Sequence, residues 1–221
     1  MKVFIGVGHG GSDPGAVANG VKEKDLNLSI ALACRDLLER HGVAVKMSRT
    51  KDEDDSVSEE IRECNAYSPD LAVDIHNNAG GGDGAEVFHH HGGGVGKALA
   101  ENILSEIAKI GQNSRGAKIR KNSQGKDYYG FIRSTTCPAV IVECAFVDNS
   151  TDLKILASEG ERQKMGEAIA KGILKTLGIE YRAETGTIYR VQVGAYLVKE
   201  NAVAMQKKIK AVGFDAFIVK E

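Results

Sequence analysis

Apolar and polar residues follow two different periods along the chain. Short stretches that alternate between apolar and polar positions, or that are almost wholly apolar, predict β-strands, and longer stretches with an apolar residue every three or four positions predict α-helices. The predicted strands are residues 2–7, 43–47, 71–76, 85–89 and 138–144, and the predicted helices are residues 25–40, 56–67, 95–110 and a long segment ending at 177. Strands and helices therefore alternate up to residue 178, which predicts an α/β fold with a mostly parallel central sheet flanked by helices.

Local signals at the ends of these segments support the assignment. The sequence from Ser56 to Glu59 resembles a capping box at the start of a helix, and Pro69 follows the end of that helix. Gly42 follows the first predicted helix and Gly178 follows the last. The almost continuous apolar run from Pro138 to Cys144 is typical of a strand buried in the middle of a sheet.

A second, smaller unit follows residue 178. Residues 179–187 are polar and lack periodicity, which predicts a linker between a domain of residues 1–178 and a unit of residues 188–221. Two strands at 188–194 and 215–219 and a helix at 199–212 make this unit a small C-terminal β-α-β unit. A unit of this size seldom buries enough surface to fold alone, so we expect it to need a partner.

Composition and charge narrow the class of protein. Hydrophobic residues make up 42% and charged residues 27% of the chain, as in folded soluble proteins. The net charge of -1 argues against binding to nucleic acid through its phosphates, so no nucleic-acid partner is expected. No apolar run is long enough to span a bilayer and no export signal is visible, so we expect no membrane insertion. The 4 cysteines form no Cys-x-x-Cys pair, which argues against a zinc ribbon or a disulfide framework.

Residues that can bind or activate a metal ion lie at or near the ends of three predicted strands. His9 follows the first strand, His76 follows the apolar residues of the third, and Glu143 lies within the last. Because ligand sites in open α/β sheets gather at the carboxyl ends of the strands, we expect these side chains to converge, and Glu23 at the start of the first helix faces the same edge. Two imidazoles and a carboxylate, with water in the fourth position, form a known catalytic zinc arrangement, and a further carboxylate can take a proton from that water.

Each of these residues also has a simpler explanation. A single histidine at a strand end is often structural, and an acidic residue is favourable at a helix N-terminus, which alone would account for Glu23. Glu143 is harder to explain, because an unpaired carboxylate within the apolar sequence from Ala139 to Phe146 is costly to bury. The combination of the four residues favours a metal site.

Four segments of the chain resemble, in the same order, the motifs of zinc-dependent N-acetylmuramoyl-L-alanine amidases. These segments are Gly8–Gly15, Gly20–Leu28, Asp74–Ala79 and Pro138–Asn149, and the resemblance covers residues 1–177. It implies cleavage of the amide bond between the lactyl group of N-acetylmuramic acid and the L-alanine of the stem peptide in peptidoglycan. It also implies one Zn2+ per chain, bound by His9, Glu23 and His76, with Glu143 as the catalytic carboxylate.

The chain departs from this family pattern at two positions. The family usually has Asp-Pro-Gly before the first histidine, where this chain has Gly6-Val7-Gly8. A glycine commonly follows two residues after the catalytic glutamate, where this chain has Ala145. Both changes are small in volume and lie beside the proposed functional atoms, so we expect them to tune the activity without abolishing it.

Other residues near these motifs have two interpretations each. Asn77 and Asn78 could form hydrogen bonds with substrate amides, or they could stabilise a turn. His89, His90 and His91 could suggest a second metal site, but adjacent residues on a strand point to opposite faces, which favours an exposed strand end. The glycines that cluster beside His9 and after His76 are expected to let a bulky glycan-peptide strand approach the metal.

The C-terminal unit from Tyr189 to Val219 resembles the first half of a SPOR domain, which is a peptidoglycan-binding module. The family module contains two β-α-β halves in one sheet, and only one half is present here. We therefore expect two chains to contribute one half each, which makes the protein a homodimer.

Together these inferences predict a cell-wall amidase that causes lysis, either a phage endolysin or a bacterial autolysin. Without a visible export signal, it is expected to be made in the cytoplasm and to reach the wall after lysis or holin-type export. Two alternatives remain open: a peptidoglycan-binding protein that no longer catalyses, and a zinc peptidase that acts on stem peptides.

Overall fold

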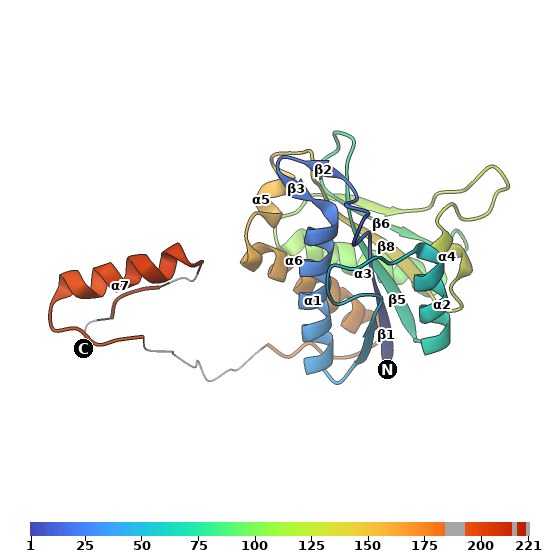
Figure 1. Ribbon diagram of the computed structural model, residues 1–221. Coiled ribbons are helices and arrows are strands. Elements are labelled where there is room, and N and C mark those ends of the chain that lie inside the picture. Colours follow the sequence, from blue (N-terminus) through green and yellow to red (C-terminus); the bar gives the residue numbers. More distant parts are fainter. Residues whose placement is uncertain (184–192, 214–215, 220–221) are drawn as a thin grey trace. The chain divides into compact units, whose positions relative to one another are not determined.

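The chain forms two compact units, Met1–Arg182 and Ala183–Glu221. The computed structural model describes residues 1–183, 193–213 and 216–219 (Figure 1). Each unit is described below by itself.

The first unit is built on a six-stranded sheet (Figure 1). The strands are β1 (Lys2–Val7), β4 (Ala44–Met47), β5 (Leu71–Asn78), β6 (Ala85–His89), β7 (Ser114–Lys118) and β8 (Ala139–Phe146). They lie in the order β4-β1-β5-β8-β6-β7. β4, β1, β5 and β8 run parallel, whereas β6 is antiparallel to β8 and parallel to β7. The predicted α/β fold with a mostly parallel sheet is confirmed.

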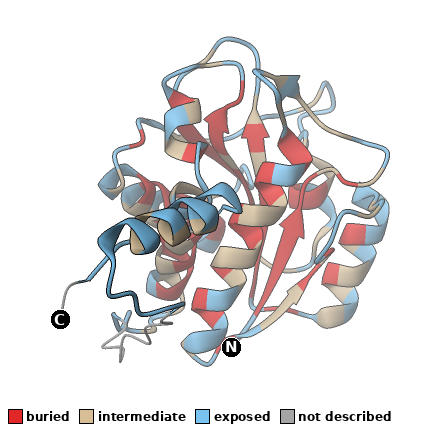
Figure 2. Cartoon of the chain, turned by 60° about the vertical axis from the view of Figure 1, so that its left-hand side comes forward, coloured by how far each residue is buried: buried red, intermediate tan, exposed pale blue. Residues whose placement is uncertain are grey.

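Helices cover both faces of this sheet. They are α1 (Glu23–Arg40), α2 (Val57–Tyr67), α3 (Gly94–Lys109), α4 (Gly130–Ser134), α5 (Asp152–Leu156) and α6 (Glu159–Thr176). α1 and α3 pack against α6 on one face, and α2 packs against α4 on the other. The side chains of β1 alternate accordingly, with Val3 and Ile5 in the first core and Phe4 in the second. Buried residues are concentrated in the strands and on the inward sides of the helices (Figure 2).

The start of α2 follows the predicted capping box. The Ser56 side chain accepts a hydrogen bond from the backbone N–H of Glu59 at 3.2 Å, and the Glu59 carboxylate accepts one from the backbone N–H of Ser56 at 3.3 Å. Together these bonds satisfy two backbone donors that have no partner within the helix.

Several short elements lie outside the predicted set. They are the hairpin of β2 (Val17–Ala18) and β3 (Val21–Lys22), the edge strand β7, and the helices α4 and α5. Elements of two to five residues are too short for a hydrophobic period to show. β7 is also polar and contains a glycine, so its sequence lacks the apolar pattern by which a strand is predicted.

The second unit contains α7 (Lys199–Ala211), which agrees with the helix predicted at 199–212. Residues 188–192 and 215 of the two predicted strands lie outside the described residues. The described parts of those strands, 193–194 and 216–219, have no regular secondary structure. None of the residues of α7 is buried.

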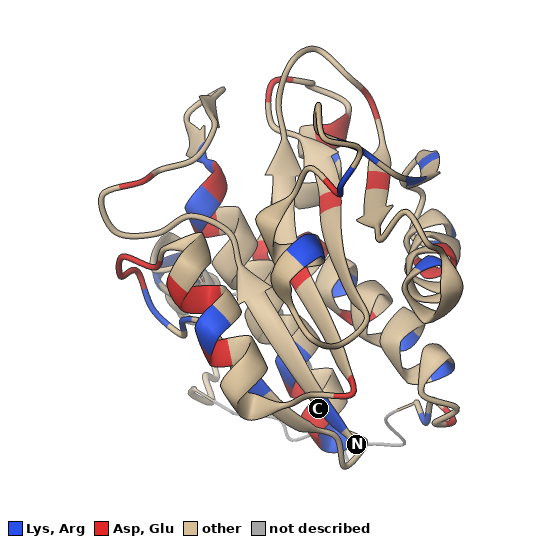
Figure 3. Cartoon of the chain, turned by 90° about the vertical axis from the view of Figure 1, so that its right-hand side faces the viewer, with Lys and Arg blue, Asp and Glu red and all other residues tan. Residues whose placement is uncertain are grey.

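Acidic and basic residues are interspersed over the surface of the first unit (Figure 3). Among the described helices, none has the length and apolar character needed to cross a membrane.

Candidate metal centre and active site

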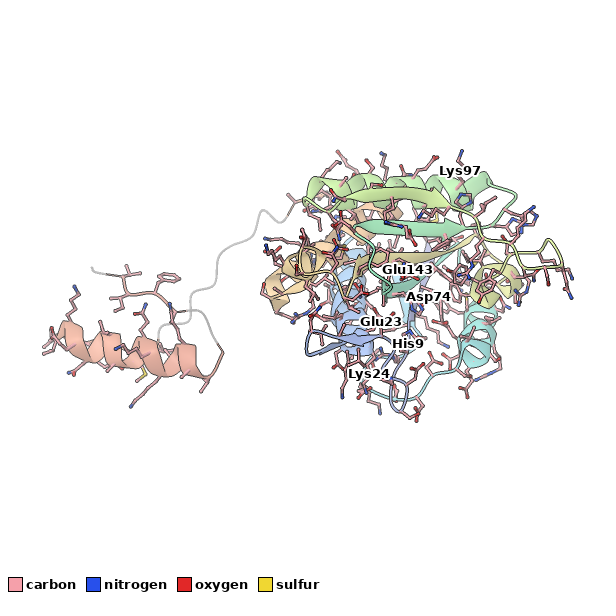
Figure 4. All side chains as sticks on the ribbon, turned by 90° about the horizontal axis from the view of Figure 1, so that it is seen from above. His9, Glu23, Lys24, Asp74, Lys97 and Glu143 are labelled. Atoms are coloured by element: carbon pink, nitrogen blue, oxygen red, sulfur yellow. The ribbon has the colours of Figure 1, made fainter. Side chains whose placement is uncertain are left out.

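The carboxyl ends of three neighbouring strands bring the predicted site residues to one edge of the sheet. β5 lies between β1 and β8, and Glu143 of β8 stands opposite His76 of β5. His9 comes two residues after the end of β1, and Glu23 is the first residue of α1. Seen from above this edge, His9, Glu23 and Glu143 lie close to one another (Figure 4).

His9, Glu23 and His76 form a compact group of metal-binding atoms. The Glu23 carboxylate lies between the two imidazoles, with Oε2 at 3.2 Å from His9 Nε2 and Oε1 at 3.1 Å from His76 Nδ1. One donor atom from each residue lies within 4.8 Å of the others. Two imidazole nitrogens and a carboxylate oxygen are donors that suit zinc, and three protein ligands leave a fourth position for water. The residues present therefore fit a catalytic zinc ion.

Each histidine of this group contacts a second carboxylate through its other ring nitrogen. His9 Nδ1 lies 2.7 Å from Asp13 Oδ2, and His76 Nε2 lies 3.1 Å from Asp74 Oδ2. Carboxylates in these positions fix the ring and its tautomer, so that the remaining nitrogen offers its lone pair to a metal. The sequence contains a signal for Asp74, which comes two residues before His76 on a strand and so shares its face. Asp13 lies in a loop, where no such period exists.

Hydrogen bonds hold the Glu23 side chain in place. Its Oε2 accepts from the backbone N–H of Ala16 at 2.9 Å, and its Oε1 accepts from the backbone N–H of Asn77 at 3.1 Å. Burial raises the pKa of the Glu23 carboxyl, but the contacts with His76 and His9 outweigh this effect and keep the pKa far below its usual range. Glu23 is therefore ionised between the two rings.

The two imidazoles occupy an acidic environment. Hydrogen bonding to Glu23 raises the pKa of His9, and Asp13 adds to this effect against the opposing effect of burial. Burial lowers the pKa of His76, but Asp74 and Glu23 outweigh it and hold the pKa well above its usual range. The surroundings thus favour the protonated, positively charged form of both imidazoles, and protons compete with a metal ion for the ring nitrogens.

Glu143 stands beside this group, and the pKa of its carboxyl group lies near neutrality. Burial raises the pKa of Glu143 to about 7, with further contributions from the charges of Glu23 and Asp74 and an opposing one from His76. A carboxyl group with this pKa can accept and return a proton at neutral pH, as general acid-base catalysis requires.

Glu86 lies opposite Glu143 on the adjacent strand β6, and its pKa is shifted in the opposite direction. The two residues are paired in the register of β6 and β8. Arg115 Nε donates to Glu86 Oε2 at 2.7 Å, and Lys118 Nζ donates to the same oxygen. Burial raises the pKa of Glu86, but these two cations outweigh it, so the pKa lies below its usual range. Of these two facing carboxyls, only Glu143 is left to exchange protons near pH 7.

The departure from the family pattern at Gly6 coincides with a buried carboxyl group from α2. A Cβ atom at position 6 would lie 2.1 Å from Glu60 Oε1 and 2.8 Å from Asp74 Oδ1. An aspartate at this position would therefore overlap the Glu60 side chain. Burial, together with the Asp74 charge, raises the pKa of the Glu60 carboxyl well above its usual range.

Arg49 supports the backbone that carries His9. Arg49 is 2% exposed, and its guanidinium donates to the carbonyl oxygens of Val7 at 3.1 Å, Gly8 at 3.3 Å and Lys24 at 2.8 Å. These bonds join the end of β1 to the first turn of α1, which carries Glu23. The sequence alone did not indicate this role, because the partners are backbone atoms.

The side chains of Asn77 and Asn78 form hydrogen bonds within the protein. Asn77 is 2% exposed and its Nδ2 donates to Asn27 Oδ1 at 2.8 Å. Asn78 Nδ2 donates to Glu86 Oε1 at 3.0 Å, and its Oδ1 accepts from the backbone N–H of Ala79 at 2.8 Å. These contacts support the structural alternative for both residues, and substrate contact by either stays a prediction.

The exposed strand end expected for the three consecutive histidines holds for His90 and His91 and is wrong for His89, which is 6% exposed. Only His89 belongs to β6, so the alternation of side chains along a strand does not apply to His90 and His91. Both of these rings contact Asp127, and one donor atom of each lies within 4.8 Å of the others. His89 lies apart, with its Nδ1 at 2.8 Å from the carbonyl oxygen of His90.

The sequence predicts that the glycines beside His9 leave room for substrate. In the structure, the space beside Gly8 is filled by the His76 ring. A Cβ atom at Gly8 would lie 2.2 Å from His76 Cε1. We expect Gly8→Ala to displace this ring and to lower the free energy of unfolding by about 1–3 kcal/mol, as overpacking usually does. Urea unfolding of the metal-free protein measures this loss.

Gly96→Ala in α3 is the matched control for Gly8→Ala. A Cβ atom at Gly96 would make an ordinary contact of 3.7 Å with the Ala139 carbonyl oxygen, and alanine favours the helix. Equal losses of stability in the two variants would contradict the explanation for Gly8.

Comparison with known proteins identifies relatives of both units. The family model described as N-acetylmuramoyl-L-alanine amidase matches residues 3–175, and the SPOR domain model matches residues 166–220. The chain is 35% identical to the N-acetylmuramoyl-L-alanine amidase CwlM of Bacillus licheniformis, over 99% of this chain and 85% of that protein. It is 34% identical to the endolysin of Bacillus phage SPP1, over 82% of this chain and 68% of that protein. Among solved structures, the N-acetylmuramoyl-L-alanine amidase AmiC2 of Nostoc punctiforme matches with a TM-score of 0.73 and 30% identity, over 80% of this chain and 97% of that one.

Proposed function

The chain belongs to the N-acetylmuramoyl-L-alanine amidase family, and from this premise we propose that it hydrolyses the amide bond between N-acetylmuramic acid and L-alanine in peptidoglycan. The observation that carries the proposal is the grouping of His9, Glu23 and His76 beside Glu143, a carboxyl group whose pKa is about 7. This arrangement combines a site for a Lewis acid with a site for proton transfer.

We propose that His9 Nε2, His76 Nδ1 and one Glu23 oxygen hold a single Zn2+ ion. When bound, zinc supplies a Lewis acid that polarises a carbonyl oxygen and lowers the pKa of water. Asp13 and Asp74 hold the two rings in the tautomer that this binding requires. Glu23 contributes the negative charge, since its own pKa is kept low by the rings on either side.

Glu143 is the group that moves the proton in this proposal. In its ionised form it accepts a proton from the attacking water, and in its protonated form it returns a proton to the amine of the departing L-alanine. Its raised pKa makes both forms accessible near pH 7. Arg115 and Lys118 keep the neighbouring Glu86 ionised, so that Glu86 does not compete for this proton.

Digestion of purified peptidoglycan tests the reaction. The enzyme should release new N-terminal L-alanine without new reducing sugar ends, a chelator should stop the release, and added Zn2+ should restore it. A protein that binds the wall but releases no L-alanine would be the catalytically silent alternative. Cleavage within stem peptides already detached from glycan would indicate the peptidase alternative instead.

The C-terminal unit supports a further part of the proposal, which is dimerisation on the wall. Several of its apolar side chains are exposed in the single chain, including Leu197 at 107%, Phe217 at 76% and Val219 at 60%. Apolar side chains in water are costly, and a second copy of the same half-module would bury them. We therefore propose that two chains pair through this unit to complete a peptidoglycan-binding SPOR module.

Light scattering at micromolar concentration tests this pairing. The unaltered protein should have twice the 23.6 kDa mass of one chain, and Phe217→Asp should have the mass of one chain. Val57→Asp, which also replaces an exposed apolar residue but lies in the first unit, should leave the dimer intact. A monomeric unaltered protein with α7 still helical would contradict dimerisation through this unit.

We propose that the enzyme acts on the cell wall after release from the cytoplasm, either as an endolysin or as an autolysin. The similarity to both a phage endolysin and a bacterial amidase supports these two settings equally.

A further inference from the structure

A second group of metal-binding side chains lies at the other end of β8. Glu86 of β6 pairs with Glu143, but His89, at the end of β6, pairs with Val140 near the start of β8, because the two strands are antiparallel. His90 and His91 follow directly after His89. The second group is therefore separated from the proposed zinc site along the strands.

The side chains of His90, His91 and Asp127 converge on one point. Asp127 Oδ2 lies 3.1 Å from His90 Nε2 and 2.8 Å from His91 Nδ1. One donor atom from each residue lies within 4.8 Å of the others. Ligand atoms about 2.0–2.2 Å from a tetrahedral zinc ion are separated from one another by roughly 3.3–3.6 Å, so small movements would bring these atoms to the required spacing.

Asp127 is fixed in position before any ion binds. It is 3% exposed, and its Oδ1 accepts from the backbone N–H of His91 at 2.9 Å. Its carbonyl oxygen accepts from Arg133 Nη1 at 2.7 Å, which ties it to α4. The side chains of His90 and His91 are 51% and 36% exposed, so an ion can reach the group from solvent and keep water ligands.

We propose that His90, His91 and Asp127 bind a second divalent transition-metal ion of the zinc class. The donor set is again two imidazoles and one carboxylate, which suits zinc and its neighbours better than magnesium or calcium. Such an ion joins the turn after β6 to the loop between β7 and α4, shown in yellow-green at the right of Figure 1. It therefore acts on the structure of this loop and takes no part in the reaction at Glu143.

Binding at this position has a defined local consequence at Gly92. The backbone N–H of Gly92 donates to His90 Nδ1 at 3.0 Å, so in the neutral ring the proton lies on Nε2. For Nε2 to bind the ion, the proton must move to Nδ1, and the hydrogen bond from Gly92 must break. Binding at His90 therefore requires the metal–nitrogen bond to outweigh the loss of this one hydrogen bond.

Zinc stoichiometry tests the second site separately from the first. The unaltered protein dialysed against micromolar Zn2+ should hold two ions per chain, His90→Asn with His91→Asn should hold one, and Glu23→Gln should hold one. His41→Asn replaces a histidine that belongs to neither group, and this variant should still hold two ions. A protein that holds one ion before and after the His90 and His91 substitutions would overturn the proposal while leaving the catalytic zinc intact.

The resonance of the Gly92 amide gives a second measurement that needs no substitution in the second group. In the Glu23→Gln variant, added Zn2+ should shift the Gly92 amide signal in proportion to the ion bound at His90. Zinc binding that leaves the Gly92 signal unchanged would place the ion elsewhere and overturn the assignment.

Discussion

Glu143→Gln is expected to lower kcat by about 10³-fold and to leave the metal content unchanged, because general acid-base catalysis contributes about 10²–10⁴-fold. The amide cannot accept the proton from water, yet it keeps the size of the carboxyl group within β8. Amidase assays on purified peptidoglycan measure the loss, and metal analysis of the same sample shows that the site is still filled.

The pH dependence of kcat/KM in the unaltered enzyme provides an independent measurement. Glu143 must be ionised to accept a proton, so kcat/KM should rise with pH through the pKa of this group. That pKa is raised to about 7, and a bound dication nearby would lower it, so the acidic limb should lie at or below pH 7. With Zn2+ kept saturating across the pH range, the limb should be lost in Glu143→Gln.

Glu86→Gln is the matched control, since Glu86 is the facing carboxyl across β6 and β8. Its charge is already neutralised by Arg115 and Lys118, so the substitution should cost far less activity than Glu143→Gln. Equal losses in the two variants would show that the edge needs negative charge in general and would remove the specific role of Glu143.

The fold could be predicted because its larger elements carry their own hydrophobic period. The 18-residue helix α1 shows its buried face in the sequence, and the 8 residues of β8 are apolar apart from Glu143. The 2-residue strands β2 and β3 form instead because the chain between β1 and α1 folds over the site, with Glu23 N–H bonded to the Ala16 carbonyl oxygen. This contact depends on tertiary structure, which a local pattern does not contain.

The candidate site divides in the same way. His9, His76 and Glu143 could be located from the sequence, because parallel strands bring their carboxyl ends to one edge. The positions of Asp13 and Glu60 could not, because each approaches the site from a loop or from another helix. The convergence of His90 and His91 could not be predicted either, because it depends on a loop that brings Asp127 to them.

Glu23→Gln is expected to lower the zinc affinity of the catalytic site by more than about 100-fold, and the amidase activity should fall to the level of the chelated enzyme. Losing a residue that only orients a ligand costs about 10–100-fold, and Glu23 is proposed as a ligand itself. Asp74→Asn is the graded comparison, because Asp74 contacts only the far side of the His76 ring, and it should lose about 10–100-fold. Zinc titration against a competing chelator measures both affinities.

A titration of the metal-free protein separates the charge of Glu23 from its role as a ligand. Hydrogen bonds and charge from Glu23 raise the pKa of His9 and of His76, so Glu23→Gln should lower both pKa values. Because protons compete with zinc for these nitrogens, zinc affinity in the unaltered protein should fall as pH drops below the raised pKa values, and in Glu23→Gln this fall should begin at lower pH. A variant whose histidine pKa values drop while its zinc affinity stays unchanged would show that Glu23 serves only to charge the rings, and the third zinc ligand would have to be a different residue.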